Sequence, residues 1–322
     1  MEDADLRKIF DPLYTDIKPE TQFSHSQPLL AHYTTIQTIE LIVKFKEMWF
    51  SNPLYMNDLE EVRFGLIEGE RAVLNSTDLA STLRTPERRN LFLRAYNFYG
   101  VDYIENYLGD TYVVCFSEHD RTDNDGKLSM WRGYGGNGCG AAIVIDTGKF
   151  SALPTSPLIL AAVEYETTEA RRAWLANKVS EFSKLLTTQN VPDLQLHVPA
   201  LVLLERIRLA ALFSKHKGFH EEKEWRVVYA RERDINKLFD PMLGYSTGSQ
   251  GIEQRLKFRI AHHPGATAED FSMSKIVDRI ILGPTVSSPL AKAAFMRMLT
   301  EHNASDLIPR VVASTIPYRQ KT

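Results

Sequence analysis

The chain has 322 residues, of which 43% are hydrophobic and 25% are charged, the usage of a globular protein rather than a disordered one. Its 38 Lys and Arg nearly balance its 41 Asp and Glu, so a net charge of −3 gives no global electrostatic reason for nucleic-acid binding. Two cysteines are too few for a disulfide framework, the apolar stretches are too short to span a bilayer, and the acidic N-terminus lacks a signal-peptide pattern. We therefore expect a cytoplasmic protein.

The first predicted strand covers residues 29–33 and leads directly into a helix. Thr34 and Gln37 match a capping box, in which each side chain binds the backbone at the other residue. Apolar residues then follow helical spacing. His32 is therefore expected at the end of a strand, just before a helix, which is a common position for a ligand-facing side chain.

A second short strand is predicted over residues 48–51, and Asp58 resembles the N-cap of a helix that continues to about residue 74. Another helix begins at Thr85, with proline in the first helical position. This helix carries a stripe of aromatic residues, which is more typical of a packed core face than of a cofactor site. The stripe consists of Phe92, Tyr96, Phe98, Tyr99, Tyr103 and Tyr107.

The rest of the chain mixes strands and helices. Strands are predicted at 111–117, 140–145, 158–165, 223–230, 276–282 and 308–313, and helices at 168–186, 194–214 and from 289. On the strand at 223–230, Glu224 and Arg226 share one face and Trp225 lies on the other. A glycine-rich run, Gly135–Gly140, is compatible with a phosphate cradle or with a mobile loop.

This mixed order favours an α+β protein over a regularly alternating parallel sheet. The first 28 residues are predicted to form an irregular N-terminal lead-in, and residues 29–322 a single domain.

Four islands stand out in chain order. They are His32-Tyr33-Thr34, the segment from Phe50 to Glu60, Cys115-Phe116-Ser117-Glu118 with Met130-Trp131-Arg132-Gly133-Tyr134, and Glu222-Lys223-Glu224-Trp225-Arg226. In this order and spacing they resemble the bacterial domain-of-unknown-function family 2971 (DUF2971), over about residues 29–230. The sequence departs from the family pattern at Leu59, where the family often has proline, and in the glycine-rich run after Tyr134.

That family in turn resembles the ADP-ribosyltransferase fold, through an early strand-borne histidine before a helix and a late strand-borne glutamate. The resemblance implies a split β-sheet core with inserted and flanking helices, and NAD as a substrate without a metal. It makes His32 the ribose-binding residue and Glu224 the catalytic carboxylate. The implied NAD-binding residues are His32, Tyr33, Thr34, Ser51, Tyr55 and Tyr134. Which of the last three supports the nicotinamide stays open.

These residue types suit the chemistry. Cleavage of the nicotinamide–ribose bond passes through an oxocarbenium-like state, as glycoside hydrolysis does. A preorganised carboxylate can stabilise such a state by roughly 3–4 kcal/mol. The sequence therefore predicts an ADP-ribosyltransferase or NAD glycohydrolase that acts on an unknown protein, nucleic-acid or small-molecule acceptor. The resemblance also implies a role in bacterial conflict or phage defence.

Two alternatives remain open at this stage. One is a catalytically silent module that binds a ligand or a partner on the same scaffold. The other is a metal-dependent hydrolase at His216 and His220, which a helix would place one turn apart. The oligomeric state does not follow from the sequence.

Overall fold

The computed structural model describes residues 2–16, 27–56, 59–149, 153, 155–248 and 251–318. The chain forms two compact units, each assembled from three segments. The helical unit comprises Met1–Lys18, Asn52–Thr111 and Val163–Phe219, and the sheet unit comprises Pro19–Ser51, Tyr112–Ala162 and His220–Thr322. Two compact units can belong to one domain, so the single domain predicted over residues 29–322 stays a prediction.

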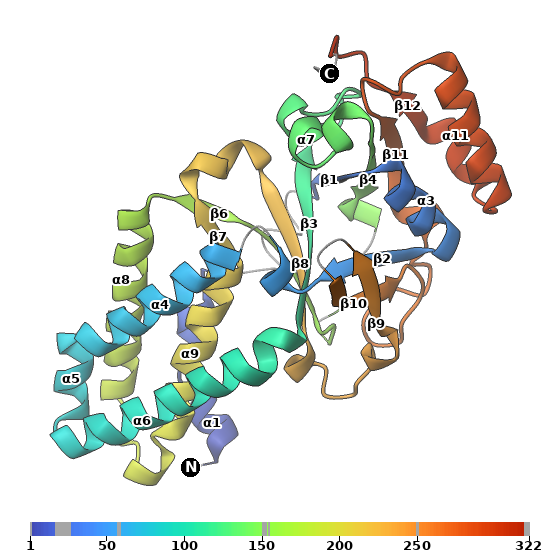
Figure 1. The fold of residues 1–322 in the computed structure, drawn as a ribbon. Helices are drawn as coiled ribbons and strands as arrows, with labels where there is room; N and C mark the ends of the chain where they lie inside the picture. Colours follow the sequence, from blue (N-terminus) through green and yellow to red (C-terminus); the bar gives the residue numbers. More distant parts are fainter. Residues whose placement is uncertain are drawn as a thin grey trace. The chain divides into compact units, whose positions relative to one another are not determined.

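The helical unit packs around one apolar helix. Its elements are α1 (Asp3–Lys8), η1 (Asp11–Tyr14), η2 (Pro53–Tyr55), α4 (Leu59–Asn75), α5 (Thr77–Leu83), α6 (Pro86–Asp102), the π-turn η3 (Tyr103–Tyr107), η4 (Leu108–Asp110), β6 (Glu164–Glu166), α8 (Thr168–Thr187), η7 (Asp193–Gln195), α9 (His197–Leu212) and β7 (Ser214–His216). Helix α9 is apolar on nearly every face and contacts α1, α4, α6 and α8 (Figure 1). Strands β6 and β7 form a small parallel pair.

The N-terminal residues belong to this helical core. Leu6, Phe10 and Leu13 follow helical spacing across α1 and η1, and all three are buried. The ring of Phe10 stacks on Phe182 of α8 at 5.0 Å. The prediction of an irregular lead-in is therefore wrong for the first helical residues, while residues 17–26 lie outside the described residues.

The sheet unit contains a ten-stranded mixed sheet. Its elements are β1 (Leu29–Thr34), α3 (Ile36–Phe45), β2 (Glu47–Ser51), β3 (Thr111–His119), α7 (Leu128–Gly133), η5 (Gly136–Gly138), β4 (Ala141–Asp146), η6 (Thr147–Lys149), β5 (Leu158–Ala162), η8 (Lys217–Glu222), β8 (Glu224–Ala230), η9 (Arg231–Arg233), η10 (Asp240–Met242), β9 (Leu243–Gly248), β10 (Gly251–Arg259), α10 (Met273–Ile276), β11 (Val277–Leu282), α11 (Pro289–Glu301), η11 (Ser305–Arg310) and β12 (Val311–Ala313). The strand order is β12-β11-β4-β1-β3-β2-β10-β9, with β8 between β3 and β5. The large mixed sheet and the many helices together confirm the predicted α+β class.

The sheet splits at β3. Near its C-terminal end β3 pairs with β1, where Ser117 lies opposite Ala31, and nearer its start it pairs with β2, where Val113 lies opposite Ser51. Cys115 lies between the two paired stretches. From there β1 and β2 lead into separate arms, β1-β4-β11-β12 and β2-β10-β9 (Figure 1).

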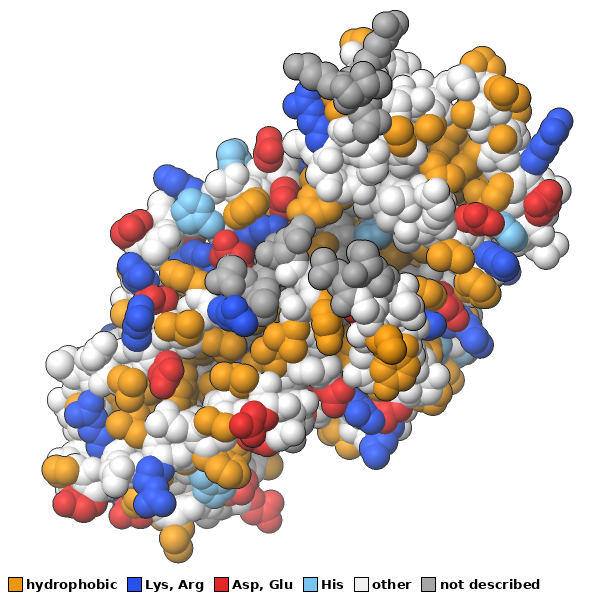
Figure 2. All heavy atoms as spheres, viewed as in Figure 1, with side chains coloured by type: hydrophobic (Ala, Val, Ile, Leu, Met, Phe, Trp, Pro, Cys, Tyr) orange, Lys and Arg blue, Asp and Glu red, His pale blue; other side chains and the backbone are white. Residues whose placement is uncertain are grey.

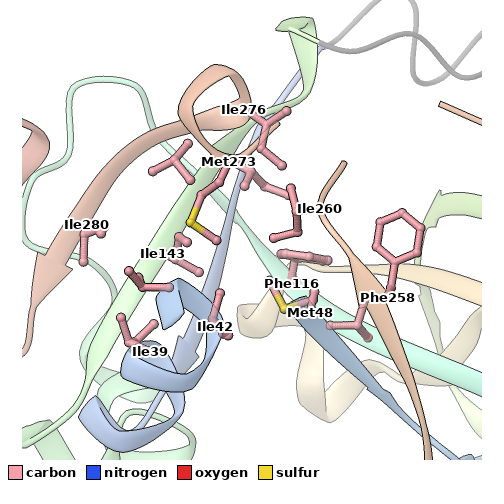
Figure 3. Packing of buried hydrophobic residues seen from close by; sticks show 14 of the residues in the cluster. Ile39, Ile42, Met48, Phe116, Ile143, Phe258, Ile260, Met273, Ile276 and Ile280 are labelled. Carbon is pink, nitrogen blue, oxygen red and sulfur yellow. The ribbon is translucent and has the colours of Figure 1, made fainter. Parts of the chain in front are cut away.

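One face of the sheet carries the main apolar core. Phe50, Phe116, Trp225 and Leu256 contribute to it from four different strands, and α3 and α11 pack against it. Figure 3 shows side chains of α3, β3 and β4 within this cluster. Because side chains alternate along a strand, the neighbours of these core residues point to the opposite face.

The helix after β1 begins one residue later than predicted. The side chain of Thr35, not Thr34, accepts a hydrogen bond from the backbone of Thr38 at 3.2 Å. Thr34 remains extended because the ladder with β4 continues to its pairing with Ala141. The capping-box prediction is therefore wrong in register, although the strand-to-helix boundary is right.

Candidate functional site

Polar side chains gather on the sheet face opposite the apolar core, which we call the polar face. It is formed by Ser51 of β2, Ser117 of β3, Glu224 and Arg226 of β8, and Glu253 and Arg255 of β10. Each of these residues alternates with a residue of the apolar core. Of the six, only Ser51 and Arg255 are not fully buried. Burial of so many polar groups on one side makes this face the first place to look for chemistry.

The centre of the polar face is the ion pair between Glu224 and Arg226. Nε of Arg226 donates to Oε1 of Glu224 at 2.7 Å, and Nη2 donates to Oε2 at 3.1 Å. The two side chains are only 6% and 2% exposed. Such a two-pronged pair fixes the orientation of the carboxylate and compensates its charge away from water.

The residue before this pair has an unusual backbone. Lys223 adopts φ of 43°, a left-handed conformation that favours glycine, and its carbonyl accepts a hydrogen bond from the amide of Glu118 at 2.8 Å. A non-glycine residue in this region costs about 1–3 kcal/mol and is often found at functional sites. The strained residue therefore lies directly before β8, whose first residue is Glu224.

A second ion pair of the same spacing lies on β10. Arg255 binds Glu253, the hydroxyl of Ser51, and the hydroxyl of Ser246 at 3.2 Å. Ser51, predicted to line the NAD pocket, is thus a neighbour of this second pair on the polar face. This second pair lies on the β2-β10-β9 arm, whereas the Glu224–Arg226 pair lies on β8, which pairs with β3 and β5.

Lys127 joins three of the sequence islands. Its backbone amide donates to the hydroxyl of Tyr33 at 3.0 Å, and its ammonium donates to Ser117 Oγ at 2.9 Å. Ser117 in turn donates to the carbonyl of Glu222. Burial lowers the pKa of Lys127 and raises the pKa of Tyr33 to about 12. Sequence reasoning missed Lys127; its position three residues before Met130, at the start of an island, was the available signal.

Tyr134 lies near the start of β8. It follows α7, is 42% exposed, and donates from its hydroxyl to Oε1 of Glu222 at 2.9 Å. Tyr55 belongs instead to the helical unit, in η2, and is 55% exposed. Within the sheet unit, the structure therefore brings Tyr33, Ser51 and Tyr134 to the side of Glu224, and it leaves Tyr55 in the other unit.

His32 does not join them. It lies two residues after Leu30, a residue of the apolar core, and so on the same face of β1; its ring meets the ring of Phe116 edge-on at 5.7 Å. Nδ1 of His32 lies 2.9 Å from the carbonyl oxygen of Cys115, at the split of the sheet. The two residues predicted to be catalytic, His32 and Glu224, thus project from opposite faces. The expectation that they form one pair is therefore corrected. Strand pairing fixes which face each side chain points to, and it turns His32 to the apolar face and Glu224 to the polar face.

The burial of His32 instead predicts that the free energy of unfolding depends on pH. Burial lowers the pKa of His32, and the hydrogen bond with Cys115 opposes this only in part. In the unfolded chain the imidazole takes up a proton near pH 6.5, whereas in the folded chain it does so only at lower pH. The free energy of unfolding should therefore be highest above about pH 6.5 and fall as the pH drops below it.

Urea unfolding between pH 5 and 8 measures this dependence. His32→Gln should flatten the slope, and His197→Gln, at a histidine whose side chain is 43% exposed in the helical unit, should leave it unchanged. An unaltered slope in the His32 variant would show that this imidazole is not buried in solution. Burial also lowers the pKa of His119, so some slope should remain.

The structure does not give His216 and His220 the helical spacing that the metal alternative assumed. His216 ends strand β7 and His220 lies in the 3-10 helix η8, so the two are not one turn apart on a single α-helix. Nδ1 of His216 accepts from the amide of Gly218 at 3.2 Å. Across the described part of the chain, no group of three or more His, Cys, Asp or Glu is placed to hold a metal ion.

The glycine-rich run forms a closed turn. The amides of Gly138 and Gly140 donate to the carbonyl of Gly135, at 3.0 and 2.9 Å. The carbonyl of Gly140 also accepts from Gly283 at 2.9 Å. These amides are already used within the fold, which argues against an open phosphate cradle.

The fold and the site together define an α+β protein with a split mixed sheet and a buried Glu–Arg pair beside the split. Residues 130–227 match the model of DUF2971, described as a protein of unknown function, and this match supports the assignment of the chain to that family. The match confirms the resemblance at Trp131, Tyr134 and Glu224, but the earlier islands lie outside it. No curated protein and no solved structure matches the chain. No helix in the described ranges is both long and apolar enough to cross a bilayer.

Proposed function

We propose that the polar face binds NAD⁺ and that Glu224 supports cleavage of the nicotinamide–ribose bond, with ADP-ribose passing to an acceptor or to water. The observation that carries the proposal is a carboxylate held rigidly on a strand beside the split of the sheet. A late strand-borne glutamate is also one of the two features through which the sequence resembles ADP-ribosyltransferases, the other being the early strand-borne His32.

The chemistry follows from the charge that develops. As the bond breaks, its electron pair leaves with nicotinamide and the ribose becomes cationic. A fixed anion in a poorly solvated site stabilises that cation without having to reorganise. Because Arg226 already orients Glu224 through two hydrogen bonds, the carboxylate is preorganised for this role.

Two further residues suit the rest of the substrate. The exposed ring of Tyr134 can stack on nicotinamide, worth about 0.5–1.5 kcal/mol beyond area burial. The ammonium of Lys127 reaches the polar face through Ser117 and supplies positive charge for the pyrophosphate. His32 lies on the opposite face, where it hydrogen-bonds to the carbonyl of Cys115, and takes no part in this site.

The test is nicotinamide release from NAD⁺ by purified protein, with and without cell lysate as a source of acceptor. Glu224→Gln should lower the rate by at least about 100-fold. Glu118→Gln is the matched control, since Glu118 lies on the neighbouring strand and binds Trp225 on the apolar face at 3.2 Å. Its rate should stay within about threefold of wild type.

His32→Gln separates two arrangements of the site. The structure predicts that this variant, if folded by circular dichroism, keeps most of its activity, because its side chain is on the other face. Equal loss in folded His32 and Glu224 variants would instead place both residues in one site. No release in any condition, and no NAD⁺ binding by calorimetry, would end the proposal.

A ligand-binding module without turnover is the second candidate. One observation favours it: Glu224 and Glu253 are each paired with the arginine two residues later, an arrangement that stiffens strands. NAD⁺ binding in calorimetry that Lys127→Met weakens, together with no nicotinamide release, would select this candidate.

A further inference from the structure

Helix α6 has two apolar faces. Its inner face carries Phe92 and Tyr96, which are buried in the core of the helical unit, as is Tyr103 just beyond the helix. Phe98, which the sequence placed in the same core stripe, is 68% exposed, so that part of the prediction is wrong. The side chain of Tyr107 lies outside the described residues. The buried aromatic stripe is therefore narrower than predicted, because only the residues on the inner side of the helix reach the core.

The outer face of α6 carries exposed apolar side chains. Leu91, Phe98 and Val101 are 43%, 68% and 54% exposed, and Ile104 in the following π-turn is 57% exposed. The spacing of seven and three residues keeps Leu91, Phe98 and Val101 on one side of the helix. Figure 2 shows hydrophobic side chains gathered at the surface where Figure 1 draws α4 and α6. Contiguous exposed patches of this kind mark interaction surfaces more often than isolated apolar residues do.

Charged residues of opposite sign lie among these apolar side chains, before and after Phe98. Arg94 lies four residues before Phe98, and Asp102 lies four residues after it, followed by Glu105. Arg94 and Glu105 are exposed and, within the described residues, neither forms an ion pair. The face thus carries an arginine four residues before Phe98 and an aspartate four residues after it.

Such a face is complementary to itself. A two-fold axis at Phe98 reverses the helix, so residues at equal distances before and after Phe98 meet. Arg94 of each copy then lies opposite Asp102 of the other, and the two Phe98 rings pack together at the axis. A parallel arrangement would place like charges opposite each other, which is unfavourable.

We propose that the outer face of α6 is the contact surface of a homodimer, in which two copies of this chain pack their α6 helices antiparallel about Phe98. The inference is independent of the proposed function, because none of its residues belongs to the polar face.

Sedimentation equilibrium of the full chain, over about 1–100 μM, tests the proposal. The wild type should approach twice the mass of one 36.7 kDa chain. Phe98→Asp should weaken the dimer by at least about 100-fold, since an aromatic anchor is lost on both sides. Ile235→Asp is the control: this residue is 89% exposed in the sheet unit, and the change should not affect the mass.

Charge reversal tests the antiparallel arrangement. Arg94→Glu and Asp102→Arg should each weaken association by about tenfold or more, and the double variant should restore it. Circular dichroism confirms that each variant is folded. A wild type that stays monomeric at all concentrations overturns the proposal, and so does a dimer that Phe98→Asp leaves intact. A dimer whose charge reversals do not compensate would reject the antiparallel arrangement.

Discussion

Glu224→Ala is expected to lower the free energy of unfolding by about 3–5 kcal/mol. The reason is that the guanidinium of Arg226, 2% exposed, would lose the carboxylate that holds it from two directions. Urea unfolding followed by circular dichroism measures the change. This effect is separate from activity, so the Glu224→Gln assay must be run below the unfolding transition.

Two further variants show whether the cost of Glu224→Ala comes from the buried charge of Arg226. Glu224→Leu combined with Arg226→Met removes both charges and should recover most of the stability, because no buried charge is left behind. Asp5→Ala, which breaks an exposed pair with Lys8, should cost no more than about 1 kcal/mol. If Glu224→Ala costs as little as Asp5→Ala, the Glu224–Arg226 pair is solvated and the polar face is open to water.

Gly140→Ala is expected to destabilise the sheet unit by at least about 3 kcal/mol. A Cβ atom at this position would lie 2.1 Å from the carbonyl oxygen of Thr34 and 2.7 Å from that of Gly135. Both obstacles are backbone, so relief requires moving the end of β1, where Thr34 pairs with Ala141, or the turn before β4. The change in thermal unfolding temperature measures the cost.

Gly133→Ala is the matched control for this substitution. A Cβ atom there meets no other atom within 4 Å, and the residue ends helix α7. It should be neutral or raise stability by up to about 1 kcal/mol, by restricting the unfolded chain. Equal stability of the two alanine variants would mean that the turn from Gly135 to Gly140 moves freely, as one of the sequence interpretations had it.

Local sequence signals determined much of the fold. The alternation along β8 correctly put Glu224 and Arg226 on one face, and the cap at Thr85 correctly started α6. These succeed because spacing within one strand, and a hydroxyl beside the first helical turn, are set by covalent geometry over a few residues. The family resemblance was likewise readable from motifs near Trp131 and Trp225.

Other elements had no local signal of comparable strength. The β9–β10 hairpin was not predicted, because its stability comes partly from the pairing of β10 with β2, as at Arg255 and Ser51. The helical N-terminus was missed for a similar reason. Its few apolar residues are meaningful only against α8 and α9, which follow more than 150 residues later.

The sequence by itself determined which residues carry polar chemistry, and only the tertiary structure decided which of them face each other. His32 and Glu224 both lie on strands, and the sequence around each of them does not show whether they point to the same face of the sheet. The register of β1 on β3 places Ala31 opposite Ser117 and so turns His32 toward the apolar core. Because a shift by one residue exchanges the two faces of a strand, pairing between distant segments settled which predicted residues share the polar face.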